Sequence, residues 1–468
     1  MNSILSMLLF AAVTVTIVSF AWGMRGDLIG GEEGAMLPGA LLGFCIARFV
    51  LPKGFLFYGF YFIALGMTGM FIGGTEPYGE TFNLIRWGDR GVPKAPNMKK
   101  GIIALCVKGA PWFGLCAAVV SVGFTALTGR YKAWQLVLLV ALLPIVRSLG
   151  TLLFNCPHNP KEGKFPKIYF SEESREEWGG LWFMLLTFLI FELVNKDWLA
   201  LAVTLCGMVG GAFGWVISQL LACATSVRMK NGKYFFGRLQ EKRRIDNWKI
   251  MEFSYGALGS GSIVFGFLLC RRTARAYAVK IMSGYADFGI SETAYAVMFA
   301  VWFAMFILDN INHFIPEKAQ WLKKPIEFLH RPMLCYIPML FIMLGNMRLA
   351  LFMAVLVLFW QAVEEFCFVQ LKKRYSITVP TVISYVLLIA ITVLLFGVIK
   401  SVDMRVWFIL ICAVYFICAC TADIAARYGL EGSPKNIFKL ISSMGSFISV
   451  KLHYIFCILL TSIMLLTY

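Results

Sequence analysis

Residues 22–43 read WGMRGDLIGGEEGAMLPGALLG, and they join two apolar runs, 3–22 and 35–51, that are each long enough to cross a bilayer. The stretch contains seven glycines and four charged residues. An ordinary hairpin between two membrane helices does not need so many glycines, which allow backbones to pack closely or to approach a ligand. Charged side chains at membrane depth persist only against protein or a water-filled cavity. The stretch therefore predicts membrane helices on both sides of a functional segment.

The composition of the whole chain is typical of a membrane protein. Of its 468 residues, 59% are hydrophobic and 15% are charged, whereas soluble domains carry about 25% charged residues. Mean hydropathy is +0.74, and apolar runs fill the length of the chain, so no soluble domain of normal size fits between them. The sequence predicts an all-α polytopic membrane protein whose chemistry lies within or just beside the bilayer.

Apolar runs near 20 residues long mark the predicted transmembrane helices. We expect about 14, within a range of 12–14, because the sixth and tenth runs are short. A further segment, 434–446, has the spacing of an interfacial helix. The predicted spans are 3–22, 35–51, 54–74, 102–127, 133–155, 180–194, 198–224, 250–270, 294–315, 333–345, 349–370, 380–399, 406–425 and 452–468.

The distribution of lysine and arginine supports this register. Loops that follow odd-numbered helices hold 29 of the 43 basic residues, and the N-terminus and the even-numbered loops hold 11. Because basic residues concentrate in cytoplasmic loops, the odd loops are predicted to be cytoplasmic and both termini external, with the plasma (inner) membrane as the location. The formal charge of +17 then indicates membrane lipids, and not nucleic acid, as the partner.

The most basic loop, 226–249, lies close to the middle of the chain and is predicted to be a cytoplasmic connector. It separates a first transmembrane half, 1–225, from a second, 250–468, and seven helices in each would give the halves opposite orientations. This is the inverted-repeat plan of many secondary transporters. A loose similarity between 32–48 and 251–271, both of which run from an acid through spaced glycines to an arginine, is the sequence support for a repeat.

The glycine-rich stretch supplies most of the predicted substrate-binding residues. Successive backbone N–H groups beside a guanidinium can form a nest for an anion, and acids stand close to the arginine. The alternative is a solvated linker whose acids interact with cytoplasmic lysines. The predicted substrate-binding residues of this stretch are Arg25, Asp27, Gly30, Gly31, Glu32 and Glu33.

Arg147 is the base that lies deepest in a predicted span, in the sequence LLPIVRSLGTLLF. A guanidinium there is expected to point into the helix bundle, because it needs a carboxylate or an anionic ligand. Two interpretations remain open, a structural ion pair and a clamp for an anionic substrate.

Acids near the predicted cytoplasmic ends of later helices are candidates for proton coupling. Asp309 and His313 are four residues apart and share a helix face, so they could relay a proton. Without a third ligand, this pair is weak evidence for a metal, and we expect no metal or cofactor. The predicted proton-coupling residues are Glu33, Asp309, His313, Glu364 and Glu365.

Two other patterns have a packing explanation first. Gly207 and Gly211 form a GxxxG motif that is typical of close helix packing. Tryptophan and tyrosine near helix ends are interpreted as anchors at the membrane interface.

The leading functional hypothesis is a secondary transporter for a small anionic or lipid-linked substrate, working by alternating access. The helix number, the lack of soluble domains and the intramembrane charges favour it. The alternatives are a membrane-embedded transferase with a site facing the cytoplasm, and a channel or non-catalytic membrane partner. The sequence contains no P-loop, GxSxG or HExxH motif that would favour an enzyme.

Overall fold

The computed structural model describes residues 4–28, 31–76, 78–85, 97–172, 174–226, 247–311, 321, 335–346, 386, 390 and 452–466. These residues form helices and contain no named strand. The helices are α1 (Ile4–Leu28), α2 (Gly31–Val50), α3 (Phe55–Gly74), α4 (Gly79–Asn83), α5 (Met98–Ala126), α6 (Ala133–Asn155), α7 (Trp178–Val194), α8 (Trp198–Ser226), α10 (Asn247–Leu269), α11 (Arg271–Ser283), α12 (Glu292–Ile311), α14 (Ile337–Met343) and α19 (Leu452–Leu466).

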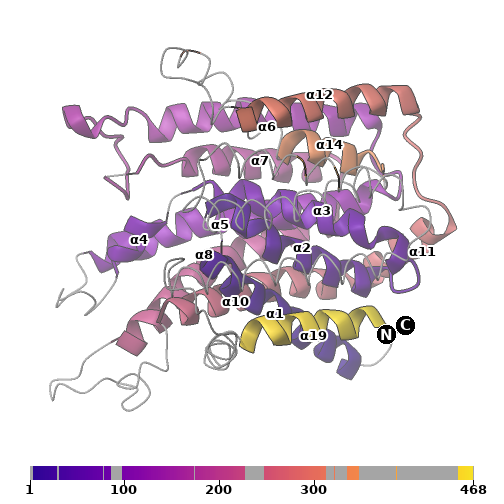
Figure 1. The fold of residues 1–468 in the computed structure, drawn as a ribbon, viewed down its shortest axis with the longest axis horizontal. Coiled ribbons are helices and arrows are strands. Elements are labelled where there is room, and N and C mark those ends of the chain that lie inside the picture. The colour runs from indigo at the N-terminus through magenta and orange to yellow at the C-terminus, as the bar shows by residue number, and fades with distance from the viewer. Residues whose placement is uncertain are drawn as a thin grey trace.

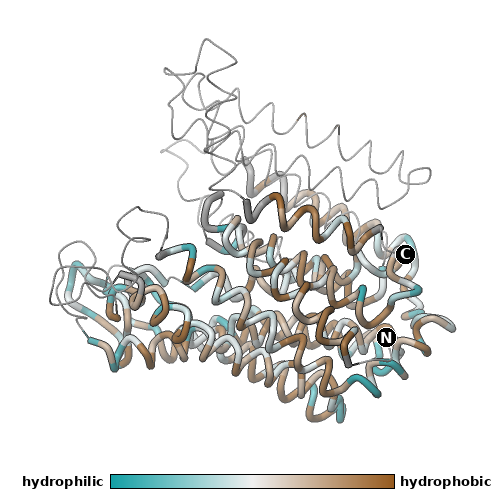
Figure 2. The backbone as a smooth tube through the Cα atoms, turned by 90° about the horizontal axis from the view of Figure 1, so that it is seen from below, coloured by the Kyte–Doolittle hydropathy of each residue, from teal (hydrophilic) through white to brown (hydrophobic). Residues whose placement is uncertain are grey.

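Five described helices are long and apolar enough to cross a membrane, and a sixth is added if α10 and α11, which meet at 79°, count as one span. They lie side by side in a bundle, with hydrophilic residues gathered towards its ends (Figures 1 and 2). The chain is therefore an all-α, membrane-embedded protein, as the composition predicts. The predicted spans 349–370, 380–399 and 406–425 and the interfacial segment 434–446 lie outside the described residues, apart from residues 386 and 390, so the total of about 14 is not established.

Glycine sets the distance between two pairs of helices. A Cβ on Gly39 of α2 would lie 2.2 Å from the carbonyl oxygen of Gly66 of α3, and a Cβ on Gly109 of α5 would lie 2.3 Å from that of Gly211 of α8. No side chain fits at either contact, so these backbones approach as closely as small residues allow. Since a Cβ on Gly207 would likewise lie 2.6 Å from the carbonyl oxygen of Phe113, the GxxxG motif is a packing motif.

The glycine-rich stretch is more helical than the sequence suggests. Helix α1 continues to Leu28 and α2 begins at Gly31, and Ile29 and Gly30 lie outside the described residues. The loop expected after 250–270 instead contains helix α11, in which four basic residues lie on a short amphipathic helix.

Successive long helices alternate in direction, so functional segments that are distant in sequence meet at the same end of the bundle. The end of α1, the start of α2, the end of α3, the start of α5 and the start of α10 share the end that carries α4 (Figure 1). The start of α1 and the end of α19 lie together at the other end. The end of the bundle that carries α4 is called the cavity end below.

Candidate functional site

A cavity of about 460 Å³ lies at the cavity end, between α1, α2, α8, α10 and the segment that follows α3. Its wall combines aromatic rings with charged side chains. The aromatic lining residues are Trp22, Tyr78, Phe82, Trp215, Trp248 and Tyr255, and the charged ones are Arg25, Glu32, Glu76 and Glu252. Five segments that are up to 233 residues apart in the chain, from Trp22 to Tyr255, therefore contribute to one site.

The aromatic side of the cavity is a continuous set of ring contacts. The rings of Trp215 and Tyr255 stack with centroids 3.7 Å apart, Tyr78 stacks on Trp215 at 4.8 Å, and Tyr78 stacks on Trp112 at 4.7 Å. Trp22, Trp112 and Trp215 are at most 3% exposed. All three are therefore interior residues, and the interpretation as an interface anchor is wrong for Trp22, which stands at the end of the predicted span 3–22.

Arg25, one of the predicted substrate-binding residues, lines the cavity beside this aromatic wall. Its Cζ atom lies 5.1 Å from the ring centroid of Trp22 and 5.4 Å from that of Trp112, which are cation–π distances. Glu32, from the start of α2, lines the same cavity. Gly31 is the first residue of α2, whereas the side chains of Asp27 and Glu33 and the whole of Gly30 lie outside the described residues.

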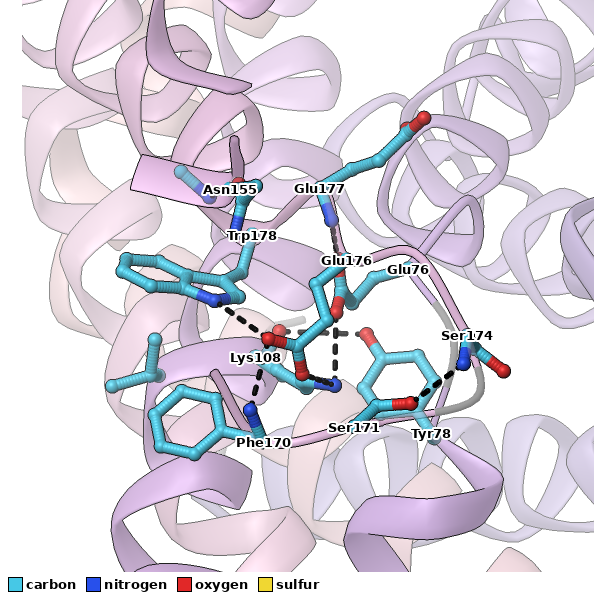
Figure 3. A network of polar contacts seen from close by, with 12 residues as sticks. Glu76, Tyr78, Lys108, Asn155, Phe170, Ser171, Ser174, Glu176, Glu177 and Trp178 are labelled. Atoms are coloured by element: carbon cyan, nitrogen blue, oxygen red, sulfur yellow. Dashed lines mark hydrogen bonds and ion pairs between the residues drawn. The ribbon is translucent and has the colours of Figure 1, made fainter. Parts of the chain in front are cut away.

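A buried lysine next to the cavity is shared by two carboxylates (Figure 3). The Lys108 Nζ atom lies 2.9 Å from Glu76 Oε1 and 2.7 Å from Glu176 Oε1, and all three side chains are at most 2% exposed. One positive charge cannot balance two carboxylates, so one of the two is favoured to hold a proton. Burial raises the pKa of Glu76 to about 7, although Lys108 opposes this shift. Glu76 therefore combines a cavity position with titration near neutral pH.

The two carboxylates are also fixed by hydrogen bonds from the segment that precedes α7. The Glu177 backbone N–H donates to Glu76 Oε2 at 2.6 Å, and the backbone N–H of Phe170 donates to Glu176 Oε2 at 3.0 Å. The indole N–H of Trp178 donates to the same Glu176 oxygen at 3.3 Å. The connection between α6 and α7 therefore closes over Lys108 (Figure 3).

A second lysine ties α10 to α1. The Lys249 Nζ atom lies 2.6 Å from Glu252 Oε2 and donates to the Gly23 carbonyl oxygen at 2.6 Å. The Glu252 carboxylate lines the cavity and is 3% exposed. Its charge is therefore balanced by a base on its own helix.

Arg147 belongs to a structural ion pair and is not among the cavity-lining residues. It pairs with Glu177 and donates to Thr75 Oγ1 at 2.9 Å. The sequence leaves open whether Arg147 forms a structural ion pair or clamps an anionic substrate. Glu177 is the carboxylate partner that the ion-pair interpretation requires. Thr75 lines the cavity, so Arg147 reaches the site only through that hydroxyl.

The predicted proton-coupling acids are not tested by this geometry. Asp309 lies in α12 with its side chain outside the described residues, and His313, Glu364 and Glu365 lie outside them altogether. Sequence reasoning missed Glu76 and Glu176. The available signal was Lys108, a base inside an apolar span that needs an acidic partner, together with the acids of GGTEPYGE and of SEESREEW.

Within the described ranges, no group of three or more His, Cys, Asp or Glu side chains is arranged to hold a metal ion. The polar groups that line the cavity include carboxylates, one guanidinium and aromatic N–H and O–H groups. No protein family, curated protein or solved structure matches the chain.

Proposed function

We propose that the protein is a membrane transporter whose substrate site is the aromatic cavity. The observation that carries the proposal is the construction of this cavity from the ends of α1, α2, α8 and α10 and the segment after α3. A site formed where several membrane helices end, beside interrupted helical segments, is typical of secondary transporters. A small relative movement of these helices would change access to the cavity, which is the requirement for alternating access.

The charges of the cavity restrict the proposed substrate. Among the described lining residues, Arg25 stands with three carboxylates, those of Glu32, Glu76 and Glu252. A single anionic group could pair with Arg25, but a second negative charge would meet the carboxylates. The proposed substrate therefore carries at most one negative charge, and the lipid-linked class remains compatible with the site.

Glu76 is the proposed proton carrier among the described residues. Its carboxylate lines the cavity and shares Lys108 with Glu176, so gain or loss of one proton changes the charge next to the substrate. A group that titrates near the working pH is suited to this role. Glu33, Asp309, His313, Glu364 and Glu365 remain predictions for the same role.

Flux through liposomes that contain the purified protein tests the proposal. A mixture of labelled sugars, amino acids and monovalent organic anions is applied with an imposed pH gradient, and uptake is compared with that of protein-free liposomes. We expect saturable uptake of at least one solute, and Arg25→Gln to lower it about tenfold or more, the value of a charged hydrogen bond. Lys164→Gln, at a side chain that is 63% exposed, is the control and should behave like the parent.

A membrane-embedded transferase is the second candidate, because Glu76 is placed and titrates as a general acid–base would. The same liposomes separate the candidates when the solutes are recovered and weighed by mass spectrometry. A solute that changes mass supports the transferase, and an unchanged solute that accumulates supports the transporter. Uptake that does not saturate at any concentration supports a channel. Uptake no greater than in protein-free liposomes, with no solute changed in mass, contradicts all three.

A further inference from the structure

The cavity wall contains buried hydrogen-bond donors that the described part of the chain does not use. The indole N–H of Trp22, at 1% exposure, has no hydrogen-bond partner among the described residues. The stacked rings of Trp215 and Tyr255 leave the Trp215 N–H and the Tyr255 hydroxyl without a well-aligned partner there. A buried donor without a partner costs about 1–3 kcal/mol. The unpartnered Trp22 N–H, beside the weakly satisfied N–H and hydroxyl of Trp215 and Tyr255, indicates a ligand that accepts hydrogen bonds.

The same wall contains acceptors. The carboxylates of Glu32, Glu76 and Glu252 line the cavity. Within the described ranges they are not part of a cluster that could hold a metal ion. Carboxylates accept hydrogen bonds and cannot donate them when ionised. A ligand that fits both sets of groups therefore has to donate and accept at several positions, as hydroxyl groups do.

Charge balance distinguishes this ligand from an ion. When Glu76 holds a proton, Lys108 balances Glu176 and Lys249 balances Glu252, and Arg25 stands near Glu32 within the same lining. A cavity in which acids and bases are matched gives little net attraction to a free cation or a free anion. The matched charges thus act as strong acceptors and donors for a neutral polar ligand.

The aromatic lining and the volume specify the ligand further. Rings such as Trp248 and Phe82 offer apolar contact to the C–H groups of a saturated ring, while their neighbours supply polar groups. The volume of about 460 Å³ is at the lower end of the range for small-molecule sites, about 300–1,000 Å³. We infer that the cavity binds a neutral sugar ring, either free in water or as the headgroup of a lipid. This inference rests on the proposed function, because it names the substrate class of the same site.

Intrinsic tryptophan fluorescence tests the inference, since Trp22, Trp215 and Trp248 line the cavity. The full chain is placed in lipid nanodiscs, so that no glucoside detergent competes. Glucose and N-acetylglucosamine are titrated, with choline and inorganic phosphate as ionic probes. We expect a saturable change with at least one sugar and none with choline or phosphate. A second arm measures the same fluorescence in discs that contain glucosyl diacylglycerol. A change in these discs without a change on adding free sugar indicates that the ligand is a lipid headgroup.

Two variants that remove single donors decide whether the cavity is the binding site. Trp22→Phe and Tyr255→Phe keep an aromatic ring and each should weaken sugar binding about fivefold or more, the value of one hydrogen bond. Trp134→Phe is the matched control, because Trp134 is 61% exposed on α6 and should leave binding unchanged. The melting temperature of each variant shows that it is folded.

The outcomes separate this inference from the proposed function. Saturable binding of choline or phosphate without binding of any sugar overturns the sugar inference and leaves the cavity as a substrate site. Sugar binding that both Phe variants leave unchanged also overturns it. If no sugar binds but another solute is taken up in the liposome assay, the sugar inference is wrong and the transporter proposal stands. Absence of any uptake contradicts the proposed function itself.

Discussion

The two ends of the bundle bury carboxylates by different means. At the cavity end, Glu76 and Glu176 meet Lys108, and Glu252 meets Lys249. At the opposite end, where α7 ends and α8 begins, Glu192 and Asp197 are fully buried, and no ion pair to either is formed by the described residues. Bases meet the buried acids at one end, whereas the described hydrogen-bond partners of the acids at the other end are neutral donors.

The neutral donors of the opposite end come from local structure. Asp197 precedes α8 and accepts a hydrogen bond from the Ala200 backbone N–H at 3.1 Å, which is the geometry of a helix N-cap, and it also accepts one from the Tyr131 hydroxyl. Thr204 donates to Glu192 at 2.7 Å. Hydroxyls and a helix dipole hold these acids without a base, and such a site has a structural role. A lysine shared by two acids instead leaves a proton that can be exchanged, which suits a functional site.

The largest expected effect is the removal of the shared base. Lys108→Met keeps the length of the side chain but leaves two carboxylates buried without their cation, and we expect the free energy of unfolding to fall by about 3–5 kcal/mol. The loss should shrink at low pH, where Glu76 is protonated. Thermal unfolding of the protein in nanodiscs measures it. Lys164→Met, at an exposed lysine, is the control and should change stability little. A stable Lys108→Met variant at neutral pH would show that the cavity end does not depend on charge balance.

The next effect concerns pH. Burial raises the pKa of Glu76 from 4.5 to about 7, so the folded state holds the proton more tightly than the unfolded state. The stabilising contribution of this group is fully present below about pH 4.5 and is lost as the pH rises through about 7, on the order of 3 kcal/mol in total. The melting temperature of the parent, measured against pH, should therefore fall between about pH 4.5 and 7. Glu76→Gln should reduce this fall, and Glu162→Gln, at an exposed acid, should not. Identical pH profiles for the parent and Glu76→Gln would place the titration elsewhere.

A smaller effect is expected at the opposite end. Tyr131→Phe removes the hydroxyl that donates to Asp197, and the loss of a hydrogen bond to a charged group costs about 1.5–3 kcal/mol. Burial, reinforced by Asp197, raises the pKa of Tyr131 well above its usual range, so the parent side chain is a neutral donor. Chemical denaturation measures the change. Tyr285→Phe, at a side chain that is 42% exposed, should stay within about 0.5 kcal/mol of the parent.

The smallest expected effect is that of Glu192→Gln, and it tests the contrast between the two ends of the bundle most directly. Glu192→Gln keeps an oxygen that accepts from Thr204, so we expect stability to change by about 1 kcal/mol or less. The same unfolding experiments measure it beside Lys108→Met. A loss as large as that of Lys108→Met would mean that Glu192 carries a charge balanced by a base, and the contrast between the two ends would be wrong.

The sequence predicts the helices of this fold better than it predicts the site. Apolar runs locate α1 to α3, α5 to α8 and α10, because the bilayer demands length and hydrophobicity from each span independently of the others. Arg25 and Glu32, which line the cavity, stand out in the sequence because they are charged residues between two apolar spans. Glu76 and Glu176 are not predicted as site residues, because each lies in a polar turn, where acids are common. Only the folding of the segment before α7 against the end of α3 brings both to Lys108.

Aromatic residues show the same limit. Trp198 and Trp22 each stand near the end of an apolar run, yet Trp198 is 63% exposed and Trp22 is 1% exposed. Hydropathy treats the two alike, because it counts residues along one helix. Which of them belongs to the cavity depends on the neighbouring helices α5 and α10, whose positions a periodic pattern does not give.

The hydrogen bonds into the shared carboxylates have a consequence for local unfolding. The backbone amides of Phe170 and Glu177 lie outside any helix, where amide hydrogens usually exchange rapidly with water. Each donates to a carboxylate that is held by a buried base. Their exchange therefore requires the opening of the Lys108 contacts, and these two amides should exchange as slowly as those of α5. The connection between α6 and α7 then unfolds together with the bundle and not as an independent loop.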